Sequence, residues 1–81
     1  MIEAIDLWQA GRMDPIFITE TTARGDVSPY YAASRENVTF VLDMLEALRG
    51  ETDMIGDAHA ARFWGGISDA IRAFAVSNLL E

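Results

Sequence analysis

The single histidine, His59, is the side chain in this sequence best suited to acid–base chemistry. Asp57 lies two positions before it, and Ser68 and Asp69 follow, so the residue types of a Ser-His-Asp triad are present. Side chains two positions apart on a helix do not face each other, however, and Asp57 is well placed to cap a helix instead. We therefore interpret His59 as a surface residue, predict no catalytic residue, and expect that the protein is not an enzyme.

Acidic side chains that could hold a cation cluster in one short segment, at Glu51, Asp53 and Asp57. Calcium loops supply alternating oxygen ligands, a central glycine and a final bidentate glutamate. Here the glutamate comes first, and Met54 and Ile55 interrupt the polar positions. The segment is therefore interpreted as a solvated acidic connection, and we predict neither a metal site nor a cofactor.

The overall charge limits the partners that the chain can bind. Asp and Glu number 13 against 6 basic residues, giving a formal net charge of −7. Such a chain is repelled by nucleic acid and has no basic stripe to neutralise phosphates, so direct nucleic-acid binding is not expected. The same charge favours a protein partner with a basic surface. Without cysteine, disulfides and thiolate metal sites are excluded.

Length and hydropathy indicate one small domain, residues 1–81, outside membranes. No apolar run reaches the roughly 18–20 residues that span a bilayer. The N-terminal residues carry acids and no positive segment, so we expect no signal peptide and a cytoplasmic location. A chain of this size buries only about 60–65% of its unfolded surface, so a partner surface is the expected source of further support.

Two long helices are predicted to form a helix hairpin, over residues 35–49 and about 57–80. The second has Asp57 as its N-cap, and the first ends at Gly50 as a C-cap. The short connection between them favours antiparallel neighbours. Apolar residues recur at helical spacing in both. They are Val38, Val41, Leu42, Leu45 and Leu48 in the first helix, and Ala60, Phe63, Trp64, Ile67, Ala70, Ile71 and Phe74 in the second.

The N-terminal third is predicted to cover one side of this hairpin. Residues 2–10 read as a short helix that directs Ile2, Ile5, Leu7 and Trp8 inward and ends at Gly11. Dense β-branched residues favour a small β-hairpin over residues 16–31, with a turn at 23–26. The fold class is therefore mostly α. The alternative is all-α, with residues 15–33 as helical turns and loop.

Gly65-Gly66 lies inside the strongest helical pattern, where glycine is unfavourable. The pair either breaks the helix or permits close approach of another backbone. No strand–loop–helix pattern accompanies it, so a phosphate-binding loop is excluded. Small residues share one face here, which could serve as an oligomer seam or pack within the chain. They are Ala58, Ala61, Gly65 and Ser68.

Aromatic residues give the best candidates for contact with a partner. Trp8 and Trp64 read as core, whereas the adjacent Tyr30 and Tyr31 point in different directions, so at least one is expected at the surface. Acidic residues then meet a basic patch. The complete predicted partner-binding set is Tyr30, Tyr31, Asp43, Glu46, Glu51, Asp53 and Asp57.

Two hypotheses follow. The first is a small acidic module that inhibits or neutralises a partner protein by occupying its surface. Phage-type anti-defence inhibitors, including anti-CRISPR proteins, and antitoxins are similar to this chain in size and charge, without a shared motif. The second is a homo-oligomeric protein that binds a small ligand or acts as a scaffold.

Overall fold

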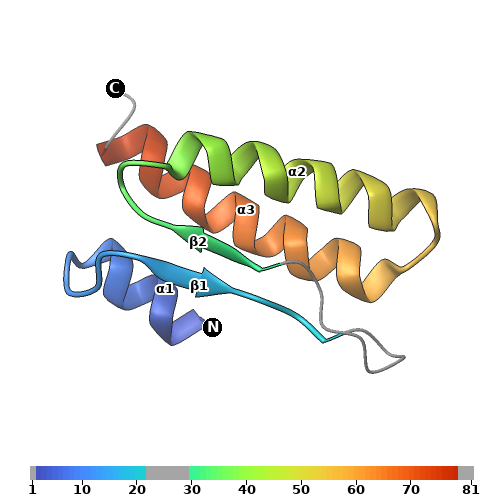
Figure 1. The fold of residues 1–81 in the computed structure, drawn as a ribbon, viewed down its shortest axis with the longest axis horizontal. Helices are drawn as coiled ribbons and strands as arrows, with labels where there is room; N and C mark the ends of the chain where they lie inside the picture. Colours follow the sequence, from blue (N-terminus) through green and yellow to red (C-terminus); the bar gives the residue numbers. More distant parts are fainter. Residues whose placement is uncertain (1, 22–29, 79–81) are drawn as a thin grey trace.

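The computed structural model describes residues 2–21 and 30–78 (Figure 1). The helices are α1 (Ile2–Gln9), α2 (Val38–Met54) and α3 (Ala58–Asn78). The strands are β1 (Ile16–Ile18) and β2 (Tyr31–Ala33), which form one antiparallel pair. The predicted mostly α fold, with a helix hairpin, a short N-terminal helix and a small β-hairpin, is confirmed.

Helices α2 and α3 pack side by side and supply most of the core. Trp64 and Leu45 are fully buried between the elements, with exposed fractions of 1% and 0%. Truncating a buried tryptophan to alanine costs about 3–5 kcal/mol, so side chains of this kind dominate the stability of a small domain. The buried core of the helix pair comprises Val38, Val41, Leu42, Leu45, Ala60, Trp64, Ile67, Ile71 and Ala75.

The start of α3 is fixed by Asp57, as the sequence predicted. Its Oδ1 accepts a hydrogen bond from the Ala60 backbone N–H at 3.1 Å, which satisfies one of the free amides of the first turn. The helix then runs without a break through Gly65-Gly66. Of the two alternatives for these glycines, the structure therefore excludes the helix break.

Both predicted ends of α2 were wrong. The helix begins at Val38 rather than residue 35, because Asn37 Oδ1 accepts from the backbone N–H of Ser34 at 2.6 Å and holds residues 35–37 in a turn. It also continues through the predicted C-cap, Gly50, to Met54. The glycine with left-handed backbone after α2 is Gly56, at φ +82°. Most of the predicted acidic connection is therefore helix.

Helix α1 docks through Trp8, which is fully buried beside Phe74 of α3 at a ring-centroid distance of 4.6 Å. The Arg35 guanidinium lies 5.3 Å from the Trp8 ring centroid and 5.5 Å from that of Phe74, and it donates to the Trp8 carbonyl. Gly11 ends the helix with φ +79°, as predicted. The predicted inward position of Leu7 was wrong, since that side chain is 39% exposed.

The β-hairpin pairs Ile16 with Ala33, Phe17 with Ala32, and Ile18 with Tyr31. The sequence prediction ended the second strand at Tyr31, where the observed strand begins, so the predicted end of this strand was wrong. The predicted turn at 23–26 lies outside the described residues. Ile16, Ile18 and Ala33 are fully buried, so one face of the hairpin packs on the helices.

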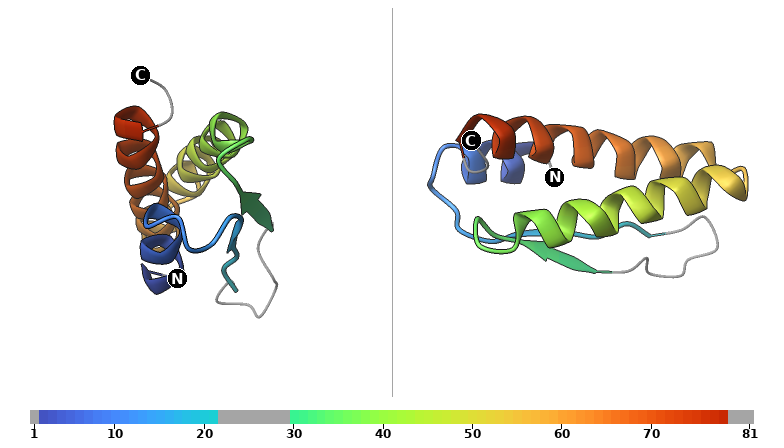
Figure 2. Two further views of the ribbon diagram at one scale, coloured as in Figure 1. Left: turned by 90° about the vertical axis from the view of Figure 1, so that its left-hand side faces the viewer. Right: turned by 90° about the horizontal axis from the view of Figure 1, so that it is seen from above.

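Two layers result from this packing. Viewed from the end, α2 and α3 lie next to each other, with α1 beneath α3 and β2 beneath α2 (Figure 2). Contacts between α1 and α3 and between α2 and β2 join the layers, and contacts between α1 and β1 hold the lower layer together. Of the helices and strands in the described residues, none covers the outer face of the hairpin.

Candidate functional site

The outer face of the β-hairpin carries a stacked pair of aromatic rings. Phe17 and Tyr30 lie 5.6 Å apart between ring centroids, with an interplanar angle of 19°. Their side chains are large and mainly apolar, yet the residues are 53% and 58% exposed. Because side chains alternate along a strand, burial of Ile16 and Ile18 forces Phe17 outward. We call Phe17 and Tyr30 the hairpin aromatic pair.

The two adjacent tyrosines differ in exposure, and at least one lies at the surface, as the sequence predicted. Tyr30 is exposed, whereas Tyr31 is partly buried and meets the Trp64 ring edge-on at 6.4 Å between centroids. Tyr31 therefore helps to fix the hairpin on α3. Of the two, only Tyr30 presents most of its surface to solvent.

The five predicted partner-binding acids divide in the same way. Asp43, Glu51 and Asp53 are exposed, and their carboxylates can act on an approaching partner. Asp57 is occupied as the cap of α3. Glu46 lies within an ion-pair network inside the helix hairpin, described next.

The Glu46 carboxylate joins α2 to α3. One oxygen accepts from Arg49 Nη2 at 2.8 Å, and the other accepts from the buried hydroxyl of Ser68 at 2.8 Å. Arg72 Nη2 lies 3.3 Å from that second oxygen. The hydrogen bonds from Arg49, then that from Ser68, hold the pKa of the Glu46 carboxyl below its ordinary value. The Glu46 carboxylate is therefore engaged within the fold and is less available to a partner than the exposed acids.

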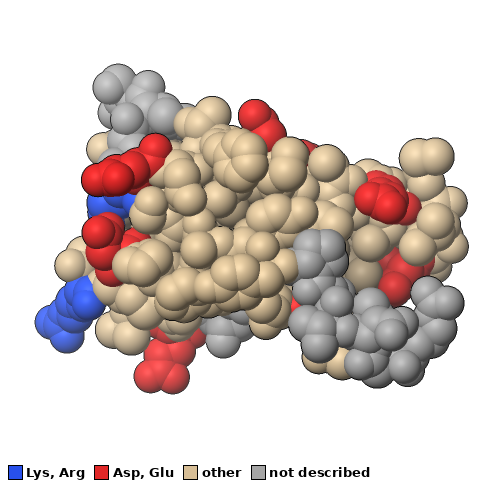
Figure 3. All heavy atoms as spheres, viewed as in Figure 1, with Lys and Arg blue, Asp and Glu red and all other residues tan. Residues whose placement is uncertain are grey.

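The C-terminal end of α2 and the connection to α3 expose two further apolar side chains. Met54 is 89% exposed and Ile55 is 75% exposed, and the acidic residues Glu51 and Asp53 precede them. On the face of the molecule that carries the hairpin, acidic side chains lie mostly around the margin and uncharged ones cover the centre (Figure 3). Apolar contacts edged by acids are thus available at the surface.

Sequence reasoning missed Phe17, Phe40, Met54 and Ile55 as exposed apolar residues. Phe17 could have been found from the strand alternation that places Ile16 and Ile18 inward. Phe40, which is 63% exposed, lies between Val38 and Val41 of the buried stripe but faces away from it. The exposure of Met54 and Ile55 depended on where α2 ends, which the sequence did not indicate.

The histidine does not assemble a triad. His59 Nε2 lies 2.9 Å from Glu20 Oε1, and the histidine side chain is 85% exposed. Ser68 donates its hydroxyl to Glu46 rather than to a base. Across residues 2–21 and 30–78, no three His, Cys, Asp or Glu side chains gather closely enough to hold a metal ion.

The predicted oligomer seam is partly occupied by the chain itself. Gly65 and Ser68 are buried against α2, where Arg49 Cδ would lie only 2.8 Å from a Cβ added at Gly65. Ala58 is exposed and Ala61 is partly buried. These two alanines line a shallow hollow of about 470 Å³ together with Arg49, Asp53 and Arg62. The group that comes close to Gly65 is therefore the Arg49 side chain of the same chain, rather than another backbone as the sequence suggested.

Comparison of the chain with protein-family models, curated proteins and solved structures gives no match. Among the helices that the structure describes, none is long and apolar enough to cross a membrane.

Proposed function

We propose that this protein is a cytoplasmic, non-enzymatic interaction module that inhibits or neutralises a partner protein by covering part of its surface. The hairpin aromatic pair is the observation that carries this proposal. Phe17 and Tyr30 stack on each other in solvent, and the packed inner face of the hairpin leaves them no route into the core.

Aromatic pairs of this kind are effective anchors for binding. Tyrosine and phenylalanine bury a large area with few rotatable bonds, and interface hot spots of about 2 kcal/mol or more are enriched in such side chains. Stacking already restrains Phe17 and Tyr30 before binding. A partner therefore meets a preorganised apolar contact.

Acidic residues define the chemistry of the partner. The chain carries a net charge of −7, and Asp43, Glu51 and Asp53 are exposed on and after α2. Complementary charge raises association rates and suppresses wrong partners, and salt screens it. The supported partner is thus a protein with an apolar contact surface bordered by Lys or Arg, such as a nucleic-acid-binding cleft. Covering that cleft would block its ligand.

The test is capture of partner proteins from the native host lysate at low salt with the tagged chain. Phe17→Ser combined with Tyr30→Ala should lower capture of a stoichiometric partner at least tenfold. Val76→Ser is the matched control, because it replaces an apolar residue that is 50% exposed on α3. This variant should capture the partner normally. Equal capture by both variants would show that the hairpin aromatic pair is not the anchor.

The acidic contribution is tested separately with Asp43→Lys, Glu51→Lys and Asp53→Lys combined. Asp57 and Glu46 are left unchanged because the fold uses them as a helix cap and a network centre. The triple variant should fold, but it should bind more slowly and lose the salt dependence of association. Unchanged association kinetics would remove charge steering from the proposal.

A further inference from the structure

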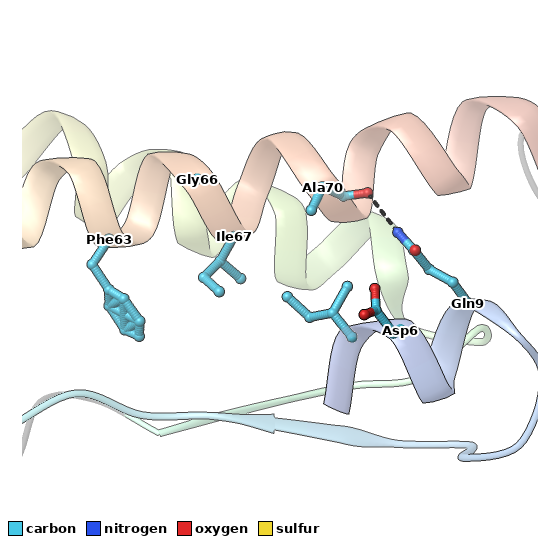
Figure 4. A pocket seen from close by; sticks show the side chains of 7 residues that line it. Asp6, Gln9, Phe63, Gly66, Ile67 and Ala70 are labelled. Atoms are coloured by element: carbon cyan, nitrogen blue, oxygen red, sulfur yellow. Dashed lines mark hydrogen bonds between the residues drawn. The ribbon is translucent and has the colours of Figure 1, made fainter. Parts of the chain in front are cut away.

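An apolar groove runs between α1 and α3, on elements that the proposed interaction does not use. Its volume is about 370 Å³, within the range of roughly 300–1,000 Å³ that small-molecule sites occupy. Side chains of α1 and α3 surround it (Figure 4). The lining residues are Ile5, Asp6, Gln9, Phe63, Gly66, Ile67 and Ala70.

Gly66 lines this groove without a side chain of its own. A Cβ added at Gly66 would meet no atom of the described residues within 4 Å, so their packing gives no reason for glycine at this helical position. The adjacent Gly65 differs, because Arg49 occupies the space beside it. Glycine is unfavourable inside a helix, so an uncrowded glycine that lines a groove is consistent with space for a bound ligand.

Polar groups lie on the α1 side of the groove. Gln9 donates its side-chain amide to the Ala70 carbonyl at 3.4 Å, which links the two helices (Figure 4). Asp6 is exposed and is the charged residue of the lining. Within the described part of the chain, no Arg or His forms an ion pair with Asp6.

We propose that the groove binds a small amphiphilic cation, with its apolar part between Phe63 and Ile67 and its positive group against the Asp6 carboxylate. The apolar lining selects a hydrocarbon or aromatic body, and the carboxylate selects a cation over a neutral or anionic head group. This site is separate from the hairpin aromatic pair. It stands or falls independently of the partner protein.

The test compares three ligands of equal chain length, octylammonium, octanol and octanoate, below their aggregation concentrations. Binding is followed through the backbone amide NMR signals of the ¹⁵N-labelled chain. Octylammonium should give saturable shifts centred on Gly66 and Ala70. Its affinity should exceed that of octanoate at least tenfold. Equal affinities for all three ligands, or shifts centred elsewhere, would overturn the proposal.

Variants then locate the site. Gly66→Leu should fill the groove and lower octylammonium affinity at least tenfold, and Gly66→Ala should lower it less. Gly50→Leu is the control, because Gly50 is also exposed in a helix and also has nothing within 4 Å of an added Cβ. Asp6→Asn should abolish the preference for octylammonium over octanol while octanol still binds. Retained binding in both Gly66 variants would refute the site.

Discussion

Replacing each of the adjacent glycines of α3 by alanine should have different consequences for stability. Both positions lie inside a continuous helix, where glycine costs roughly 1 kcal/mol relative to alanine. Space for the new methyl group exists at Gly66 but not at Gly65, where Arg49 Cδ would lie 2.8 Å from the added Cβ. The structure therefore predicts that two neighbouring, chemically identical substitutions change the free energy of unfolding by different amounts.

The magnitude follows from the contacts. Gly66→Ala should raise the free energy of unfolding by about 1 kcal/mol, the full difference in helix propensity. Gly65→Ala has the same intrinsic benefit, but Arg49 must move and weaken its bonds to Glu46 at 2.8 and 3.2 Å. An exposed pair of this kind is weak, but the displaced arginine stem also loses packing. Gly65→Ala should thus be less stable than Gly66→Ala.

Urea unfolding followed by tryptophan fluorescence and circular dichroism measures both variants, since Trp8 and Trp64 are buried in the folded state. For a domain of this size, 1 kcal/mol corresponds to a shift of about 4–8 °C in Tm. The decisive comparison is made in the Arg49→Ala variant. There, Gly65→Ala should become as stabilising as Gly66→Ala. Equal effects of Gly65→Ala with and without Arg49 would refute the close approach.

Two further predictions concern the ends and the centre of the helix pair. Asp57→Ala should lower the free energy of unfolding by about 1 kcal/mol, because the Ala60 amide loses its acceptor, and thermal unfolding measures this. The lowered pKa of Glu46 predicts a stabilising contribution that is complete above the ordinary pKa of 4.5 and is lost as pH falls through the lower folded value. Glu46→Gln should therefore flatten the acid limb of the stability–pH curve, and an unchanged limb would contradict the network.

The sequence predicted the helices well, since their apolar stripes have strong helical periodicity. Asp57 and Gly11 were also identified correctly, because capping depends on local chemistry that the residue types reveal. The boundaries of α2 were not apparent from the residue types, although the contact that delays its start, Ser34 to Asn37, is local in sequence. Asn37 tethers the turn before α2, and nothing in the residue types shows that Gly50 continues as helix.

The candidate site was only partly predictable. The separation of Tyr30 from Tyr31 followed from strand alternation, which acts between neighbours. The sequence did not reveal that the Glu46 carboxylate is already occupied within the fold. That occupation depends on Ser68 and Arg72 of α3, which contact Glu46 of α2. The stacking of Phe17 on Tyr30 likewise depends on strand register, which the sequence analysis did not predict.

The central claim is that Tyr30 on the hairpin touches the partner protein, and site-directed photo-crosslinking tests it most directly. The photoreactive residue p-benzoylphenylalanine replaces Tyr30 in one chain and Val76 in another, and each is irradiated in native host lysate. The account predicts a single adduct with a basic protein from position 30 and none from position 76. An adduct from position 76 only, or a crosslink from position 30 to a second copy of this chain alone, would contradict it.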